Sequence, residues 1–155
     1  MTLPTGLVTD FDFLTGSWHV VNRRLKHRLV GSNDWDEFDA LSTCEPRLGG
    51  VGNVEQIDCP ERGFSGMTIR LFDLAESRWS IYWANSTVGR LEPPVCGGFD
   101  GNVGIFEGPD IDAGEPMTVR FTWAVIDSGH ARWQQAFSRN DHDWETNWIM
   151  EFTRR

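Results

Sequence analysis

The fold is decided by the segment Met117-Thr-Val-Arg-Phe-Thr-Trp-Ala-Val-Ile-Asp127, which is followed by Ser128-Gly129 and by His130-Ala-Arg-Trp-Gln-Gln-Ala-Phe-Ser-Arg139. Apolar side chains occupy alternate positions of both runs, and this period of two is typical of half-buried strands. One face of the first run carries Val119, Phe121, Trp123 and Val125, and one face of the second carries Trp133, Gln135 and Phe137. Since a connection as short as Asp127-Ser-Gly129 joins antiparallel neighbours, the segment predicts a β-hairpin with one apolar face.

The same kind of run recurs along the chain between Gly, Pro, Asn and Asp, and helical periodicity is nearly absent. The predicted strands are Gly16–Leu29, Trp35–Cys44, Val51–Asp58, Phe64–Asp73, Arg78–Asn85, Val88–Pro93, Asn102–Glu107, Met117–Asp127, His130–Arg139 and Trp144–Arg154. Short connections make neighbouring strands pair as hairpins, and closing such a meander removes both sheet edges. We therefore predict an all-β protein, an up-and-down antiparallel β-barrel of about ten strands. A helical turn at Val8–Leu14 is placed to plug one end.

We expect one domain, residues 1–155, because the chain has no linker, repeat or low-complexity tract. The balance of 14 Lys+Arg against 23 Asp+Glu gives a net charge of −9, which disfavours nucleic acid and anionic membranes as partners. The N-terminus lacks a signal-peptide pattern, and no apolar run reaches the roughly 18 residues of a membrane helix. Cys44, Cys59 and Cys96 form no C-x-x-C pair, which favours reduced thiols and a cytoplasmic location.

The chain has eight Trp beside ten Phe and one Tyr, an unusual choice for simple core filling. Alternation places Trp79, Ile81 and Trp83 on one face of the fifth strand, and Trp144, Trp148, Met150 and Phe152 on one face of the last. Because interior width grows with strand number, about ten strands leave room for a small ligand. Plain core packing is the competing interpretation of these Trp residues.

The opening Phe11-Asp-Phe-Leu-Thr-Gly-Ser-Trp18 resembles the G-x-W signature of lipocalins and other calycins. This resemblance implies that Trp18 plugs the closed end of the barrel and that Arg154, from the last strand, packs across it. A guanidinium over an indole face gains cation–π energy of about 0.5–2 kcal/mol, so the pairing has a physical reason.

The chain more closely resembles an uncharacterised bacterial calycin-like family, over nearly its whole length. The shared motifs are Leu48-Gly-Gly-Val-Gly-Asn-Val54, Glu92-Pro-Pro-Val95, Val119-Arg-Phe-Thr-Trp123, Arg132-Trp-Gln-Gln-Ala-Phe-Ser138 and Trp144-Glu-Thr-Asn-Trp-Ile-Met150. That family implies a barrel without an assigned activity. The chain also resembles the haem-binding nitrobindins, whose iron is held by a His near the C-terminus. Since Asp143–Arg155 contains no His, haem is not expected. We predict no cofactor.

The candidate ligand-binding residues are Trp83, Arg120, Phe121, Trp123, Trp133, Gln135, Asn147, Trp148 and Met150. Gln135 is singled out because alternation places its amide on an apolar face, where it either orients a ligand or bonds a neighbouring side chain or water. A register slip of one residue would exchange the faces and turn a polar set inward. That set is Arg120, Gln134, Glu145 and Asn147.

Other constellations are less specific. The four His lack zinc-site spacing, so we predict no metal, and neither a nucleophile elbow nor a P-loop is present. His130 is expected at the barrel rim, with a general-base role as the alternative. The basic run Arg23, Arg24, Lys26, His27 and Arg28 is either a solvated strand face or a cationic rim that attracts an anionic ligand group such as a carboxylate.

Three functions remain open on this evidence. The first is binding of a small, largely apolar or aromatic molecule in the barrel. The second is a cofactor-independent enzyme, of the cyclase, isomerase or hydratase type, that uses the same cavity. The third is a filled barrel that acts as a homodimeric structural or interaction protein. An inward carboxylate or His with a shifted pKa would favour the enzyme.

Overall fold

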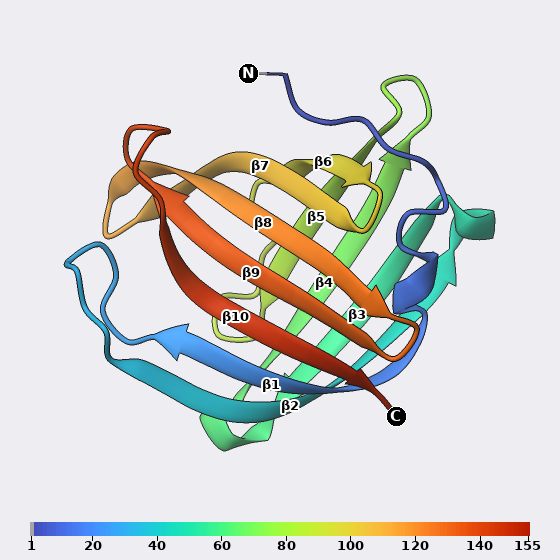
Figure 1. Cartoon of the computed structure of the whole chain (residues 1–155). Coiled ribbons are helices and arrows are strands. Elements are labelled where there is room, and N and C mark those ends of the chain that lie inside the picture. The colour runs from blue at the N-terminus through green and yellow to red at the C-terminus, as the bar shows by residue number, and fades with distance from the viewer. Residues whose placement is uncertain (1) are drawn as a thin grey trace.

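The computed structural model of the protein describes residues 2–155, which form a barrel of ten strands (Figure 1). The strands are β1 Gly16–Leu25, β2 Trp35–Arg47, β3 Gly52–Cys59, β4 Phe64–Asp73, β5 Arg78–Asn85, β6 Val95–Asp100, β7 Val103–Asp112, β8 Glu115–Asp127, β9 His130–Ser138 and β10 Glu145–Arg154. Each strand pairs antiparallel with the next, and β10 pairs with β1 to close the barrel. The predicted all-β, up-and-down barrel is confirmed.

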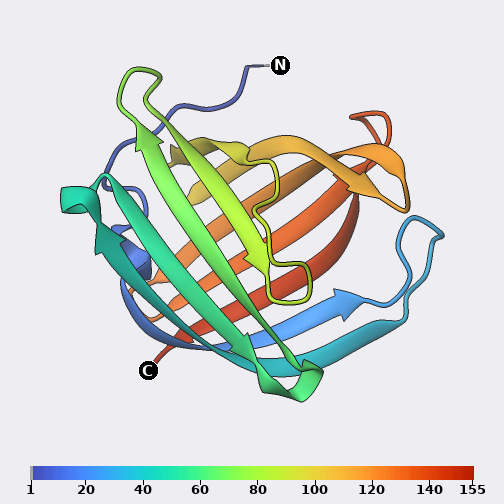
Figure 2. The same ribbon diagram turned by 180° about the vertical axis from the view of Figure 1, so that it is seen from behind.

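The sixth predicted strand, Val88–Pro93, is wrong. Residues 86–94 form a loop, and β6 begins only at Val95. Pro93 and Pro94 have no N–H to give to a ladder, so the segment leading into them does not extend the sheet. Its only bridge is between Leu91 and Ala84, and β5 and β6 pair over just Trp79–Ile81. Figure 2 shows the long loop that leaves the end of β5.

One end of the barrel, called the closed end here, is sealed by the N-terminal segment (Figure 1). The predicted turn at Val8–Leu14 is present as a short 3₁₀ turn, Asp12–Leu14. Phe11 is buried against the rings of Trp79, Phe99 and Phe106. This segment therefore plugs the barrel with apolar side chains.

Trp18 and Arg154 complete the closed end. The indole N–H of Trp18 donates to the carbonyl of Leu14 at 2.9 Å, and the guanidinium carbon of Arg154 lies 4.2 Å from the Trp18 ring centre. Arg154 also donates to the carbonyls of Phe13 and Thr15. The expected packing of Arg154 across Trp18 is thus present.

A β-bulge in β10 corrects one predicted face. The register between β9 and β10 shifts between Thr146 and Trp148, so the alternation before the bulge is offset by one residue. Trp148, Met150 and Phe152 are buried as predicted. Trp144 was predicted on the same face but lies on the outer one, where the guanidinium carbon of Arg120 is 3.8 Å from its ring centre.

The other end, called the open end, carries the β1–β2 loop at residues 26–34, the β5–β6 loop at residues 86–94 and the β9–β10 turn (Figures 1 and 2). β1 stops at Leu25 and not at Leu29, and the loop that follows contains Leu29 and Gly31, which have positive φ of 61° and 69°. Within residues 2–155 no helix is long and apolar enough to cross a membrane.

Candidate ligand-binding cavity

A cavity lies inside the barrel between its centre and the open end. About 70 Å³ of it is open to the centre of a water molecule. Its walls are mainly apolar and aromatic, and the polar side chains Glu55, Thr68, Arg70, Gln135, Glu92 and Asp110 are spaced around them. A single water needs roughly 10–15 Å³ on this measure, so the cavity accommodates a small molecule of several atoms.

Most of the predicted site residues meet at this cavity. Its lining includes Trp83, Phe121, Trp123, Trp133, Gln135, Trp148 and Met150. Phe121, Gln135 and Trp148 are direct cross-strand partners on β8, β9 and β10, and directly opposed residues share a face of a sheet. The period-two pattern thus brings these side chains to one interior.

Arg120 does not line the cavity. It lies on the outer face over Trp144, and its guanidinium is 3.6 Å from the carboxylate of Glu107. The alternative register, which turns Arg120 and Gln134 inward, is therefore wrong. Glu145 lies at the open end, where its carboxylate accepts the backbone N–H of Leu29 at 2.6 Å.

Asn147 is buried although it does not line the cavity. It is the residue that the β10 bulge leaves out of the β9–β10 register, and its side-chain oxygen accepts a hydrogen bond from the Gln135 amide at 2.7 Å. The interpretation of Gln135 as bonded to a neighbouring side chain is thus realised. Because that bond uses the amide nitrogen, it fixes the side chain of Gln135 and leaves its oxygen as an acceptor.

The aromatic rings form a connected wall. Ring centres are 5.0 Å apart for Phe121 and Trp133, 5.8 Å for Trp133 and Trp148, and 6.2 Å for Trp148 and Trp83, all in edge-to-face geometry. The indole N–H of Trp148 donates to Asn22 at 3.0 Å. Within the described residues, the N–H groups of Trp123 and Trp133 have no protein acceptor, although buried indoles usually find one.

Sequence reasoning missed a buried ion pair in the cavity lining. Arg70 on β4 donates to Glu55 on β3 at 2.6 Å and to the Asn53 oxygen at 3.0 Å, and Ser42 donates to the other Glu55 oxygen at 2.6 Å. Arg70 Nε has no partner within residues 2–155. The signal was available, because Arg70 stands at even spacing between Phe64 and Phe72, and period two places all three on the inner face.

Two carboxyl groups at the mouth of the cavity, those of Glu92 and Asp110, were also missed. Burial raises the pKa of Glu92, as does the charge of Asp110, whereas Arg28 and Arg90 act in the opposite direction. Burial also raises the pKa of Asp110, against the effects of the Ile111 N–H and Arg28. Neither carboxylate is in an ion pair with another described residue. Glu92 belongs to the loop that was predicted as a strand, and Asp110 lies beyond Glu107, where the seventh strand was predicted to end, whereas β7 continues to Asp112.

The geometry defines a closed ten-stranded barrel with an internal aromatic cavity. Comparison with known protein families finds no matching family model, and comparison with curated proteins finds no significant match. Among residues 2–155, no group of three or more His, Cys, Asp or Glu side chains is arranged to hold a metal ion.

Proposed function

We propose that the protein binds a small, largely apolar or aromatic molecule in the barrel cavity. The observation that carries this proposal is an internal cavity whose walls are mainly aromatic and apolar and include a few polar groups, as in small-molecule sites. Sites for drug-sized ligands span about 300–1,000 Å³, so this cavity favours molecules nearer the size of a single aromatic ring. The proposal includes a cytoplasmic location, which the three free thiols favour.

The polar groups suit a ligand that carries hydrogen-bond acceptors. Trp123 and Trp133 line the cavity, and within residues 2–155 no protein group accepts a hydrogen bond from their indole N–H groups. An unpaired buried donor costs about 1–3 kcal/mol, so an acceptor atom on the ligand gains what these groups lack. The oxygen of Gln135 can accept from a ligand hydroxyl or N–H.

The test uses phenol, indole and toluene as probes, with binding followed by calorimetry and by magnetisation transfer from the indole N–H of Trp133. Val119→Phe fills the cavity from a position that is 4% exposed. Val103→Phe adds the same atoms on the outer face and is the matched control. We expect the wild type and Val103→Phe to bind at least one probe, and Val119→Phe to bind at least tenfold more weakly.

Overpacking of a core costs about 1–3 kcal/mol, so circular dichroism checks that Val119→Phe remains folded. If Val119→Phe does not fold, the magnetisation-transfer experiment on the wild type still shows whether the probe binds in the cavity. The proposal is overturned if no probe binds the wild type, or if the bound probe receives no magnetisation from the cavity indoles.

A second candidate function is acid–base catalysis in the same cavity, favoured by Glu92 and Asp110. Carboxyl groups whose pKa is raised by burial are suited to general acid and base roles near neutral pH. The test incubates the protein with a mixture of small metabolites and follows their masses. Consumption by the wild type but not by Glu92→Gln/Asp110→Asn supports an enzyme, and identical spectra contradict it.

A further inference from the structure

A second recess lies at the open end, and it shares no lining residue with the internal cavity. This open-end groove has a volume of about 750 Å³. It is lined by Arg24, Leu25, Lys26, His27, Arg28, Val30, Asp36, Asp112 and Ala113. The groove therefore gathers most of the basic run of the sequence, together with two carboxylates.

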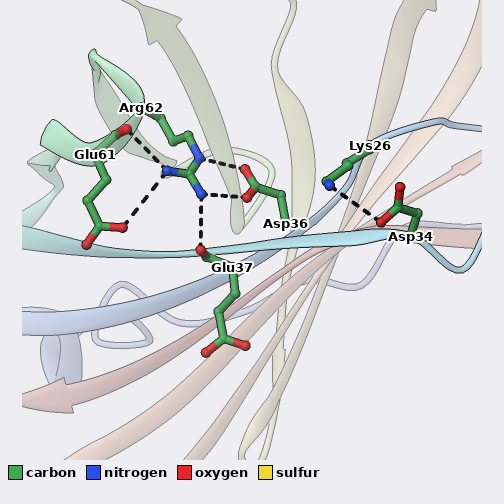
Figure 3. Close-up of polar contacts among 6 residues, drawn as sticks. All are labelled: Lys26, Asp34, Asp36, Glu37, Glu61 and Arg62. Atoms are coloured by element: carbon green, nitrogen blue, oxygen red, sulfur yellow. Dashed lines mark hydrogen bonds and ion pairs between the residues drawn. The ribbon is translucent and has the colours of Figure 1, made fainter.

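Most charges in this region are already paired, as Figure 3 shows for two of the pairs. Lys26 lies 3.5 Å from Asp34, and Arg62 makes a two-pronged contact with Asp36. Arg28 lies 3.5 Å from Asp112. Both carboxylates of the groove thus have a cation of their own, and neither is left for Arg24.

Arg24 is the exception. It points to the inner face, because its cross-strand partners are Trp148 and Asp36. Its guanidinium carbon lies 5.0 Å from the ring centre of Trp148, 5.1 Å from Phe38 and 5.2 Å from Phe64. Three aromatic rings on three strands therefore hold the group in place.

The charge of Arg24 has no protein counter-ion. Within residues 2–155 no carboxylate lies within ion-pair distance of it, and none of its N–H groups donates to a protein acceptor. Burial lowers the pKa of Arg24, and Arg28 and Arg62 lower it further, whereas Asp36 and Cys59 act in the opposite direction. The guanidinium of Arg24 is held in place beside two other positive charges, so a bound anion would stabilise it.

We propose that Arg24 anchors a binding site for the carboxylate of a small organic acid in the open-end groove. The aromatic rings contact the guanidinium without using its N–H donors, which form the planar fork that matches a carboxylate. Val30 and Ala113 offer apolar contact to the carbon part of the acid. Because the whole chain carries a net charge of −9, the attraction is local and weakens with salt.

The test titrates the protein with benzoate at low salt, with the Nε–H signals of the arginines followed by NMR. We expect the Arg24 signal to shift and benzoate affinity to fall about tenfold or more in Arg24→Gln, since hydrogen bonds to charged groups are strong. Arg24→Lys keeps the charge without the fork and should weaken binding severalfold. Arg23→Gln is the matched control, because Arg23 is the neighbouring exposed residue that stacks on Trp35 instead.

Two further arms separate the alternatives. Val119→Phe, which fills the internal cavity, should bind benzoate as the wild type does. This result would show that the Arg24 site does not depend on ligand binding in the cavity. Inorganic phosphate should bind more weakly than benzoate. The proposal is overturned if the Arg24 signal does not move, if Arg23→Gln loses as much affinity as Arg24→Gln, if phosphate binds as tightly, or if Val119→Phe abolishes benzoate binding.

Discussion

Arg154 at the closed end and Arg24 at the open end both lie over a buried tryptophan, but only Arg154 has acceptors for its nitrogens. The three nitrogens of Arg154 donate to the carbonyls of Ser128, Thr15 and Phe13 at 2.6–3.0 Å. Arg24 stacks on Trp148 with no such bond among the described residues. Stacking on tryptophan is thus combined with a full set of hydrogen bonds for Arg154 at the closed end, whereas at the open end it leaves the N–H donors of Arg24 without protein acceptors.

The two ends differ in the same way elsewhere. At the closed end, apolar side chains such as Phe11 pack around the bonded indole N–H of Trp18, and the buried pair of Arg70 and Glu55 lies beside Phe11. The open half holds the half-buried carboxyls Glu92 and Asp110, the cavity mouth and the groove around Arg24. Local rules of stability are commonly broken where a protein binds or reacts, so this asymmetry supports the proposal that ligands bind in the open half.

The largest expected effect is that of Trp18→Ala at the closed end. Trp18 is 1% exposed, and removal of such a side chain costs about 3–5 kcal/mol of the free energy of unfolding. Trp144→Ala is the matched control, because it too carries an arginine over its ring but lies on the outer face, and its loss should be about 1 kcal/mol or less. Urea denaturation measures both, and equal losses would contradict a special role for the seal.

Arg70→Met probes the buried pair in the cavity lining. It leaves Glu55 buried without its cation, which costs about 3–5 kcal/mol. The double variant Arg70→Met/Glu55→Met removes both charges and should recover much of the loss, because two apolar side chains need no partner. If both variants unfold at the same urea concentration, the ion pair is not what stabilises these positions.

Glu92→Gln/Asp110→Asn tests the electrostatics of the open half. Both carboxyls have a pKa raised by burial, so their protonated forms favour the folded state, and stability is lost as pH rises through the folded-state pKa. The neutral variant escapes this loss and should be more stable than the wild type at pH 7. Below their ordinary pKa values of 4.5 and 3.8 the advantage should vanish. Asp12→Asn, at an exposed position, controls for the loss of a negative charge. The prediction is wrong if Glu92→Gln/Asp110→Asn is less stable than the wild type at pH 7.

The smallest effect is a difference in thiol reactivity between the two ends. Burial raises the pKa of Cys44, near the closed end, and of Cys59, near the open end, to about 11 in both cases. Their thiolate fractions are therefore alike, and labelling reports local opening. In a Cys96→Ser background we expect Cys59 to react severalfold faster at pH 8, as peptide mass spectrometry would show. Equal rates would mean that the ends open together.

Alternation in the sequence predicted nine of the ten strands near their observed places, the meander and most of the cavity wall, because a strand's period of two fixes which residues share a face. It would also have placed Arg70 on the inner face had it been applied to β4. Alternation did not predict the positions of Trp144 and Asn147, because a β-bulge offsets the alternation and no local sequence pattern indicates the bulge.

What the sequence by itself determined is therefore the barrel and its inner face, since both follow from the local period of each strand. The pairing of Arg70 with Glu55, the meeting of Glu92 and Asp110 at the cavity mouth and the unpaired state of Arg24 were decided only by the tertiary structure. The physical reason is that a charge finds or lacks a partner through the closure of the barrel, which brings together strands distant in the chain.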